Sequence, residues 1–357
     1  MSSWKHIYTR LGFTKSYNAL LFSIFATPFF VFALSQAIQF FALNRLPQTI
    51  PGERWWQSGR GRLGIFLHLA AVLPCALLSI LQLVPAIRHK WPTFHRINGR
   101  FSIILFLISN IGALMIADHT FGGTFDMQFM IICLALLPTI SGALAYYNIC
   151  QLQIKKHRAW MLRTMFYAGA ILTSRPIIAI GAVFVSTLGT YHNIWPCEMI
   201  DFAWREHGAR AGAYLAKYPH CSPSLRNGTG SAAIVRANIF SKHDIAEIGA
   251  SFQIPGSASF MFSLVLHAVG VEIYLALTRK EVSRLRIESY RRQRAAKYIN
   301  PGFAGLVAES FGDTDPWKYT GKEVLIEIVL NNGNRRSCDR ESVNGSSEIN
   351  DLLLSRP

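Results

Sequence analysis

Hydrophobic residues gather into blocks of about 20 positions along the chain, and charged residues fall mostly between these blocks. A helix rises 1.5 Å per residue, so each block is long enough to cross a hydrocarbon core of roughly 30 Å. The blocks are continuous and lack strand-like alternation, which favours helices over a barrel. We therefore predict an all-α, polytopic transmembrane helix bundle with six spanning segments: Ala19–Leu43, Leu63–Ile87, Phe101–Ala117, Met127–Cys150, Met161–Thr187 and Pro255–Leu277.

The same pattern divides the chain into two parts. Residues 1–279 form the transmembrane domain, which includes a long polar loop at about residues 188–254. Residues 280–357 begin with a basic stretch in which apolar side chains recur at helical spacing, and they continue as a polar, largely disordered tail. We expect the basic stretch to lie as a helix on an anionic leaflet; the alternative is a solvated basic segment.

Composition agrees with a membrane protein, because 51% of the residues are hydrophobic and only 16% are charged. The net charge of +16 would suggest nucleic acid in a soluble protein. Here the positive charges flank apolar blocks, as expected for side chains that set orientation and contact lipid head groups. We therefore expect membrane lipids as partners and no nucleic acid.

The distribution of Lys and Arg predicts the orientation in the membrane. Most short basic flanks fall on one side, which places both termini in the cytosol; the basic loop at residues 45–62 is a contrary signal. The 188–254 loop then faces the lumen of a secretory-pathway membrane, for which we expect the endoplasmic reticulum. It carries a glycosylation acceptor at Asn227 and two cysteines, Cys197 and Cys221, that could pair there.

Two similar polar blocks precede the third and fifth predicted segments. "FHRINGR" ends at Arg100, and "KKHRAWMLR" ends at Arg163. Both fall on the predicted cytosolic side, where helix N-termini and guanidinium groups attract anions. The candidates for anion binding are His95, Arg96, Arg100, His157, Arg158 and Arg163. The alternative is that these residues only anchor the helices.

Besides Arg163, which lies at the start of the fifth segment, four histidine or charged residues fall inside predicted spanning segments, where such groups are costly and often functional: His68, Arg175, His267 and Glu272. Arg175 could pair with Glu272, or contact His267 through water. The alternative is a polar clasp that only holds two helices together.

The histidines also permit a haem hypothesis. His68 and His119 lie near one face of the predicted bundle, and His95 and His157 lie near the other, so two b-type haems could be ligated in an electron carrier. A small-molecule transporter is a third alternative. No metal site is predicted, because no CxxC or HExxH motif occurs, and no catalytic signature is present, so an enzyme is the less favoured interpretation.

The two blocks, together with His68 and Arg175, resemble a family of multi-pass membrane proteins of unknown function from bacteria and fungi. The resemblance covers roughly Leu63–Ala182, and the long loop and basic tail are similar to fungal members. Some of these look like proteins encoded beside terpenoid or indole-diterpene pathways. The resemblance implies an accessory role in specialised metabolism, with membrane-associated biosynthetic enzymes as partners.

Overall fold

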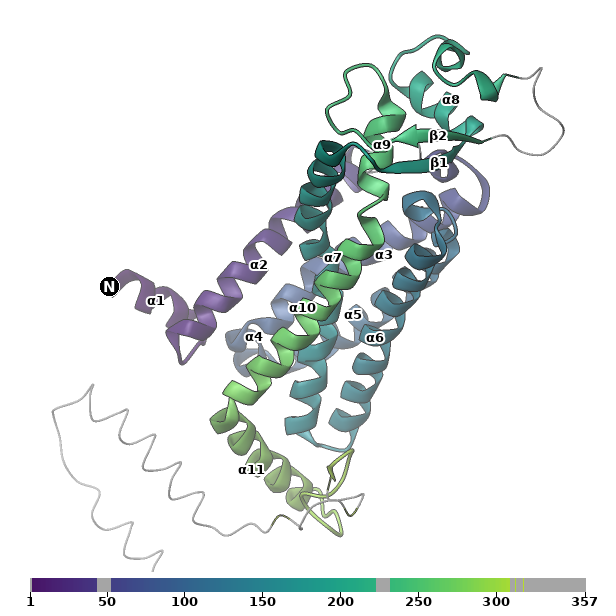
Figure 1. The fold of residues 1–357 in the computed structure, drawn as a ribbon. Helices are drawn as coiled ribbons and strands as arrows, with labels where there is room; N and C mark the ends of the chain where they lie inside the picture. Colours follow the sequence, from purple (N-terminus) through teal and green to yellow (C-terminus); the bar gives the residue numbers. More distant parts are fainter. Residues whose placement is uncertain (1, 44–52, 223–231, 309–311, 313–316, 318–357) are drawn as a thin grey trace, which may run out of the picture. The chain divides into compact units, whose positions relative to one another are not determined.

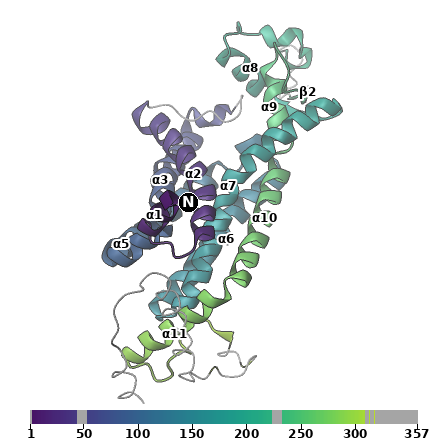
Figure 2. The same cartoon turned by 90° about the vertical axis from the view of Figure 1, so that its left-hand side faces the viewer.

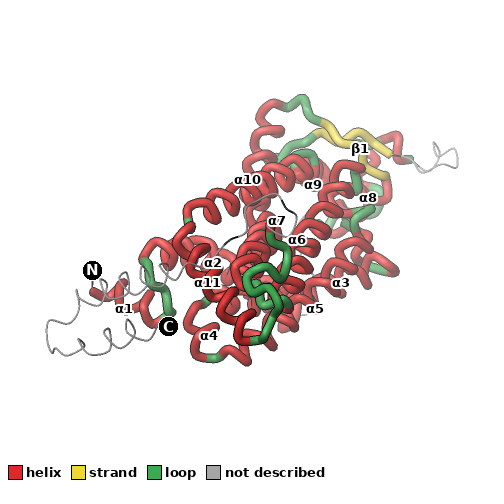
Figure 3. Tube along the Cα trace, turned by 90° about the horizontal axis from the view of Figure 1, so that it is seen from below, coloured by secondary structure: helices red, strands yellow, loops and turns green. Residues whose placement is uncertain are grey.

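The computed structural model describes residues 2–43, 53–222, 232–308, 312 and 317. Figure 3 shows that this part of the chain is mostly helical, with two short strands. Six helical segments are long and apolar enough to cross a membrane, which confirms the predicted fold class. They are Ser16–Ala42, Gly59–Leu83, Pro92–Ile116, Phe125–Cys150, Ile154–Leu188 and Ile245–Leu277.

Figure 1 labels the elements along the chain. The helices and strands are α1 (Ser2–Arg10), α2 (Ser16–Ala37), α3 (Gly59–Leu83), α4 (Pro85–Lys90), α5 (Pro92–Ile116), α6 (Phe125–Cys150), α7 (Ile154–Leu188), β1 (His192–Pro196), α8 (Cys197–Glu206), β2 (Ala232–Arg236), α9 (Ile245–Gln253), α10 (Gly256–Leu277) and α11 (Arg279–Ala295). A π-helical turn at Ile38–Ala42 extends α2.

The chain forms two compact units. The first comprises Met1–Tyr146 and Ala159–Ala276, and the second comprises Tyr147–Arg158 and Leu277–Pro357. The hydrophobic pattern predicts a domain boundary near residue 279. It does not indicate that residues 147–158 belong to the same unit as the C-terminal part of the chain. Hydrogen bonds explain this association: the Gln153 amide donates to the carbonyls of Gly302 and Ala304, at 3.2 and 2.9 Å.

Two spanning helices begin earlier than the hydrophobic pattern indicates. Helix α5 starts at Pro92, where the pattern predicts Phe101, and α7 starts at Ile154, where it predicts Met161. Proline suits the first turn of a helix, since the N–H it lacks would have no partner there. Both His-Arg pairs therefore lie inside helices, in the first two turns, and polar residues extend each helix beyond its apolar part.

Helices α3 and α5 come into close contact because glycines face each other at their crossing. A Cβ atom on Gly112 would lie 2.5 Å from the backbone nitrogen of His68 and 2.6 Å from the carbonyl oxygen of Gly64. No side chain fits at that distance from backbone atoms. The close approach brings His68 within hydrogen-bonding distance of Ser109, one turn before Gly112.

Helices α7 and α10 run side by side in opposite directions (Figures 1 and 2). The Arg163 guanidinium donates to both carboxylate oxygens of Glu272, at 2.6 and 2.9 Å. Further along α7, the hydroxyl of Thr173 lies 2.7 Å from Nε2 of His267. His267 and Glu272 therefore act as a polar clasp that holds α10 against α7.

The 188–254 segment is a folded cap with its own core. Strands β1 and β2 pair antiparallel, with Trp195 opposite Ala233, and alternate residues point into the core. The core residues are Trp195, Cys197, Met199, Ile200, Ala203, Tyr214, Tyr218, Cys221, Ala233, Val235, Ala246 and Ala250. A disulfide joins Cys197 to Cys221. The predicted glycosylation site at Asn227 and the predicted disordered tail lie outside the described residues.

Candidate functional site

One end of the first unit is strongly basic. We call the stretch from Arg88 to Arg100, which comprises the end of α4 and the start of α5, the basic end. It contains Arg88, His89, Lys90, His95, Arg96 and Arg100. Arg96 and Arg100 are exposed and stand one helical turn apart, while His95 is half-buried. The sequence contains no acidic residue between Glu53 and Asp118, so this surface has no acidic neighbour nearby in the chain.

Arg163, the last residue of the second polar block, is held in an ion pair, in contrast to the exposed Arg96 and Arg100. Its guanidinium is engaged by Glu272 and lies 4.6 Å from the ring centroid of Trp160. Twelve residues, about 18 Å of helix, separate it from Arg175, so Glu272 pairs with Arg163 instead of the Arg175 that the sequence suggests. Arg163 thus serves helix pairing, although its place in the polar block suggests anion binding.

His157 and Arg158 belong to the second unit. Both are half-buried near the start of α7, and the Arg158 guanidinium lies 3.4 Å from the hydroxyl of Thr278. A single anion site built from both His-Arg blocks remains a prediction.

A buried polar cluster lies in the first unit, away from the basic end. Glu53, in the loop before α3, is 7% exposed, and its Oε1 atom accepts a hydrogen bond from the backbone N–H of Phe121 at 3.1 Å. His68 contacts Ser109 through Nδ1, at 2.9 Å from Oγ and 3.1 Å from the carbonyl oxygen. Arg175 interacts electrostatically with Glu53 and His68, and its guanidinium carbon lies 5.8 Å from the Phe121 ring centroid.

A tight turn at Phe121 holds Glu53 in this cluster. Phe121 adopts a positive φ of 54°, which is unusual for a residue other than glycine, and its N–H thereby reaches Glu53. Non-glycine residues held in this conformation are often found where the surrounding structure imposes it. We call Glu53, His68, Ser109 and Arg175 the Glu53 cluster.

Burial raises the pKa of Glu53 to about 8, although the Phe121 N–H and the charge of Arg175 both act to lower it. The carboxyl is therefore mostly protonated at neutral pH. The hydrophobic pattern indicates His68 and Arg175 but not Glu53, which lies outside the apolar segments. The only feature of the sequence that singles out Glu53 is that no further acidic residue follows it until Asp118.

Three histidines of the first unit contact residues other than histidine. His68 bonds Ser109, His267 bonds Thr173, and His119 lies 2.8 Å from Asp118 while its ring packs on Trp55. The bond from His119 lowers the pKa of Asp118. None of these contacts brings two of the histidines together, and the haem hypothesis stays a prediction.

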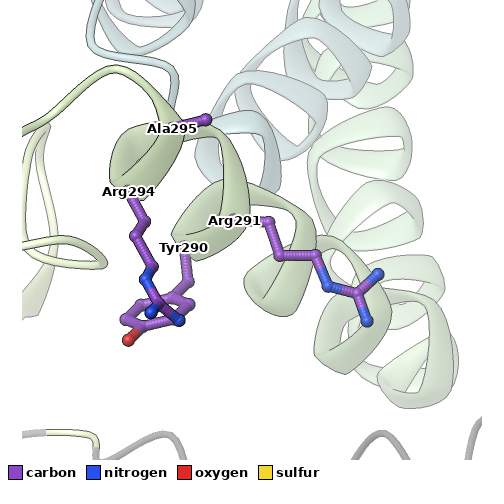
Figure 4. Close-up of a pocket in the computed structure, with 4 residues that line it drawn as sticks. All are labelled: Tyr290, Arg291, Arg294 and Ala295. Atoms are coloured by element: carbon purple, nitrogen blue, oxygen red, sulfur yellow. The ribbon is translucent and has the colours of Figure 1, made fainter.

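Helix α11 in the second unit carries exposed arginines beside an open hollow of about 420 Å³, lined by Tyr290, Arg291, Arg294 and Ala295. Figure 4 shows Arg294 beside the Tyr290 ring, with Arg291 extending in another direction. The apolar residues Leu285 and Ile287 are buried within the protein. Much of the apolar face that we expected to enter the leaflet is therefore covered by the chain itself.

Comparisons with known proteins identify relatives of the membrane domain. Residues 65–195 match a family described as predicted membrane protein (DUF2306). The Ava biosynthesis cluster protein G of Aspergillus versicolor is 23% identical over 231 residues, covering 57% of this chain and 66% of that protein. The chain thus spans slightly less than two thirds of this relative's length. No solved structure matches the chain.

Proposed function

We propose that this chain is an accessory membrane protein of a fungal-type biosynthetic pathway, and that its basic end binds an anionic lipid or a phosphate-bearing intermediate. In this proposal the chain resides in the endoplasmic reticulum membrane with both termini and the basic end in the cytosol. It would hold pathway enzymes or a lipophilic intermediate at the membrane surface. Similarity to a protein named for a biosynthesis cluster supports the pathway setting.

The observation that carries the anion-binding proposal is the exposed pair Arg96 and Arg100 at the start of α5. Residues four apart lie on the same helix face, so the two guanidinium groups can approach one anion. The N–H groups of a first helical turn have no partner within the helix, and they add a positive potential at the same end. Arginine also binds phosphate through two parallel hydrogen bonds, which gives such a site geometric selectivity.

The double variant Arg96→Gln/Arg100→Gln tests this proposal. Purified protein in nanodiscs of phosphatidylcholine with 20% phosphatidic acid, about one lipid in five, should melt several degrees higher than in phosphatidylcholine alone, because an anion bound only by the folded state stabilises it. We expect the double variant to lose most of that increase. Thermal unfolding in both lipid compositions measures it.

The matched control is Arg60→Gln/Arg62→Gln, which removes the same charge from two exposed arginines at the start of α3. This control should keep the lipid-dependent increase. Equal losses in the two double variants would show a general charge effect and contradict a site at the basic end. In a producing host, the Arg96/Arg100 variant should also lower product yield while the protein remains in the membrane.

The orientation is tested by the two glycosylation acceptors. Asn227 lies in the segment that we place in the lumen, and Asn344 lies in the tail that we place in the cytosol. Protein from a eukaryotic host should migrate faster on a gel after peptide N-glycosidase treatment. Asn227→Gln should remove this shift and Asn344→Gln should not; a shift that depends on Asn344 would reverse the topology.

A further inference from the structure

The Glu53 cluster contains polar atoms that lack hydrogen-bond partners. Among the described residues, the Nε atom of Arg175 and the Oε2 atom of Glu53 are both buried without a partner. Buried polar atoms of native proteins are almost always hydrogen-bonded, and a guanidinium within a membrane domain is especially costly. Two such atoms in one cluster therefore call for a physical reason.

Three acceptor atoms of the Glu53 cluster already have partners. The carbonyl and hydroxyl oxygens of Ser109 contact His68, and Oε1 of Glu53 accepts from Phe121. Glu53 and Arg175 interact electrostatically, but among the described residues no salt bridge within 4.0 Å joins them. The cluster thus holds a guanidinium without a close carboxylate, and its neighbour Glu53 is mostly neutral at pH 7.

Part of the Arg175 side chain is exposed on one side of α7. The Arg175 side chain is half-buried, and Pro176 and Ala179 near it on α7 are exposed. The Phe121 ring forms an apolar wall beside the guanidinium. A molecule with an apolar body and an acceptor head could therefore approach from the bilayer and present that head to Arg175.

We propose that the Glu53 cluster is a binding site for the carboxylate head of a lipophilic acid. The planar guanidinium of Arg175 would donate two parallel hydrogen bonds to the carboxylate, a geometry that lysine cannot reproduce. Glu53, as a neutral acid, would donate its O–H to the same head group. The site is separate from the basic end, so this inference does not depend on the function proposed for that surface.

Oleate is the probe, and methyl oleate is its neutral counterpart with the same chain. In phosphatidylcholine nanodiscs at pH 7, we expect tritiated oleate to bind the wild-type protein saturably and raise its melting temperature. Unlabelled oleate should displace the label, and methyl oleate should not. Arg175→Gln should weaken oleate binding at least tenfold. Arg175→Lys keeps the positive charge but cannot donate two parallel hydrogen bonds, and it should weaken binding several-fold.

One further variant distinguishes the Arg175 site from a site at the basic end. Arg96→Gln/Arg100→Gln removes two exposed guanidinium groups outside the Glu53 cluster and should bind oleate like the wild type. Oleate binding that is absent from the wild type, or unaffected in a folded Arg175 variant, would overturn the proposal. Binding lost only in the Arg96/Arg100 variant would likewise overturn it and move the carboxylate site to the basic end.

Discussion

Gly112→Ala is expected to cause a large loss of folded protein and a lower melting temperature. The new Cβ would lie 2.5 Å from the His68 nitrogen and 2.6 Å from the Gly64 oxygen, and both are backbone atoms that cannot rotate away. Helices α3 and α5 would have to separate, at a cost of about 1–3 kcal/mol or more. The separation would also stretch the bond between His68 and Ser109.

Gly142→Ala is the matched control, since Gly142 lies within the long helix α6. A Cβ at this position would meet the Thr164 side chain at 3.7 Å, an ordinary van der Waals distance. Both substitutions gain the same helix propensity, roughly 1 kcal/mol, so that contribution cancels in the comparison. Size-exclusion chromatography in detergent and thermal unfolding measure the difference. If the two variants melt within about a degree of each other, the close crossing of α3 and α5 is wrong.

Glu53→Gln is expected to stabilise the protein at alkaline pH and to have little effect at pH 5. The folded-state pKa of about 8 exceeds the ordinary value of 4.5, so the folded state binds more protons between these two values. Stability therefore falls as pH rises through this window and levels off above pH 8. Glutamine stays neutral and avoids this loss, which is on the order of a few kcal/mol for a shift of this size.

The measurement is the melting temperature of wild type and variant at several pH values from 5 to 9. The two curves should coincide near pH 5 and diverge up to about pH 8, with the variant melting higher. Arg175, whose charge acts on the Glu53 carboxyl, is present in both proteins. Asp201→Asn, which removes a carboxyl in the cap outside the cluster, should leave the pH dependence unchanged. Parallel curves for Glu53→Gln and wild type would mean that Glu53 is ionised in the folded state.

The sequence by itself determined the class of fold and the number of spanning helices. The free energy of inserting a long apolar segment into a bilayer depends mainly on the composition and length of that segment. It can therefore be judged from the sequence without knowing which segments are its neighbours. The same local information located His68 and Arg175 as polar residues within apolar helices. It misplaced the starts of α5 and α7, because polar side chains in the first turns of a helix do not interrupt its backbone hydrogen bonds.

Only the tertiary structure decided which polar groups meet. Glu272 pairs with Arg163 and not with Arg175, the partner that the sequence suggested, because the antiparallel register of α7 and α10 sets which turns face each other. Glu53 is held near Arg175 by a strained turn at Phe121. The two residues are far apart in the sequence, and hydrophobic periodicity does not predict contacts between such distant residues. The 188–254 segment was expected to be a loop, yet it encloses its own core around Trp195. Pairings between distant segments depend on packing geometry, and the one-dimensional pattern of polarity does not contain that geometry.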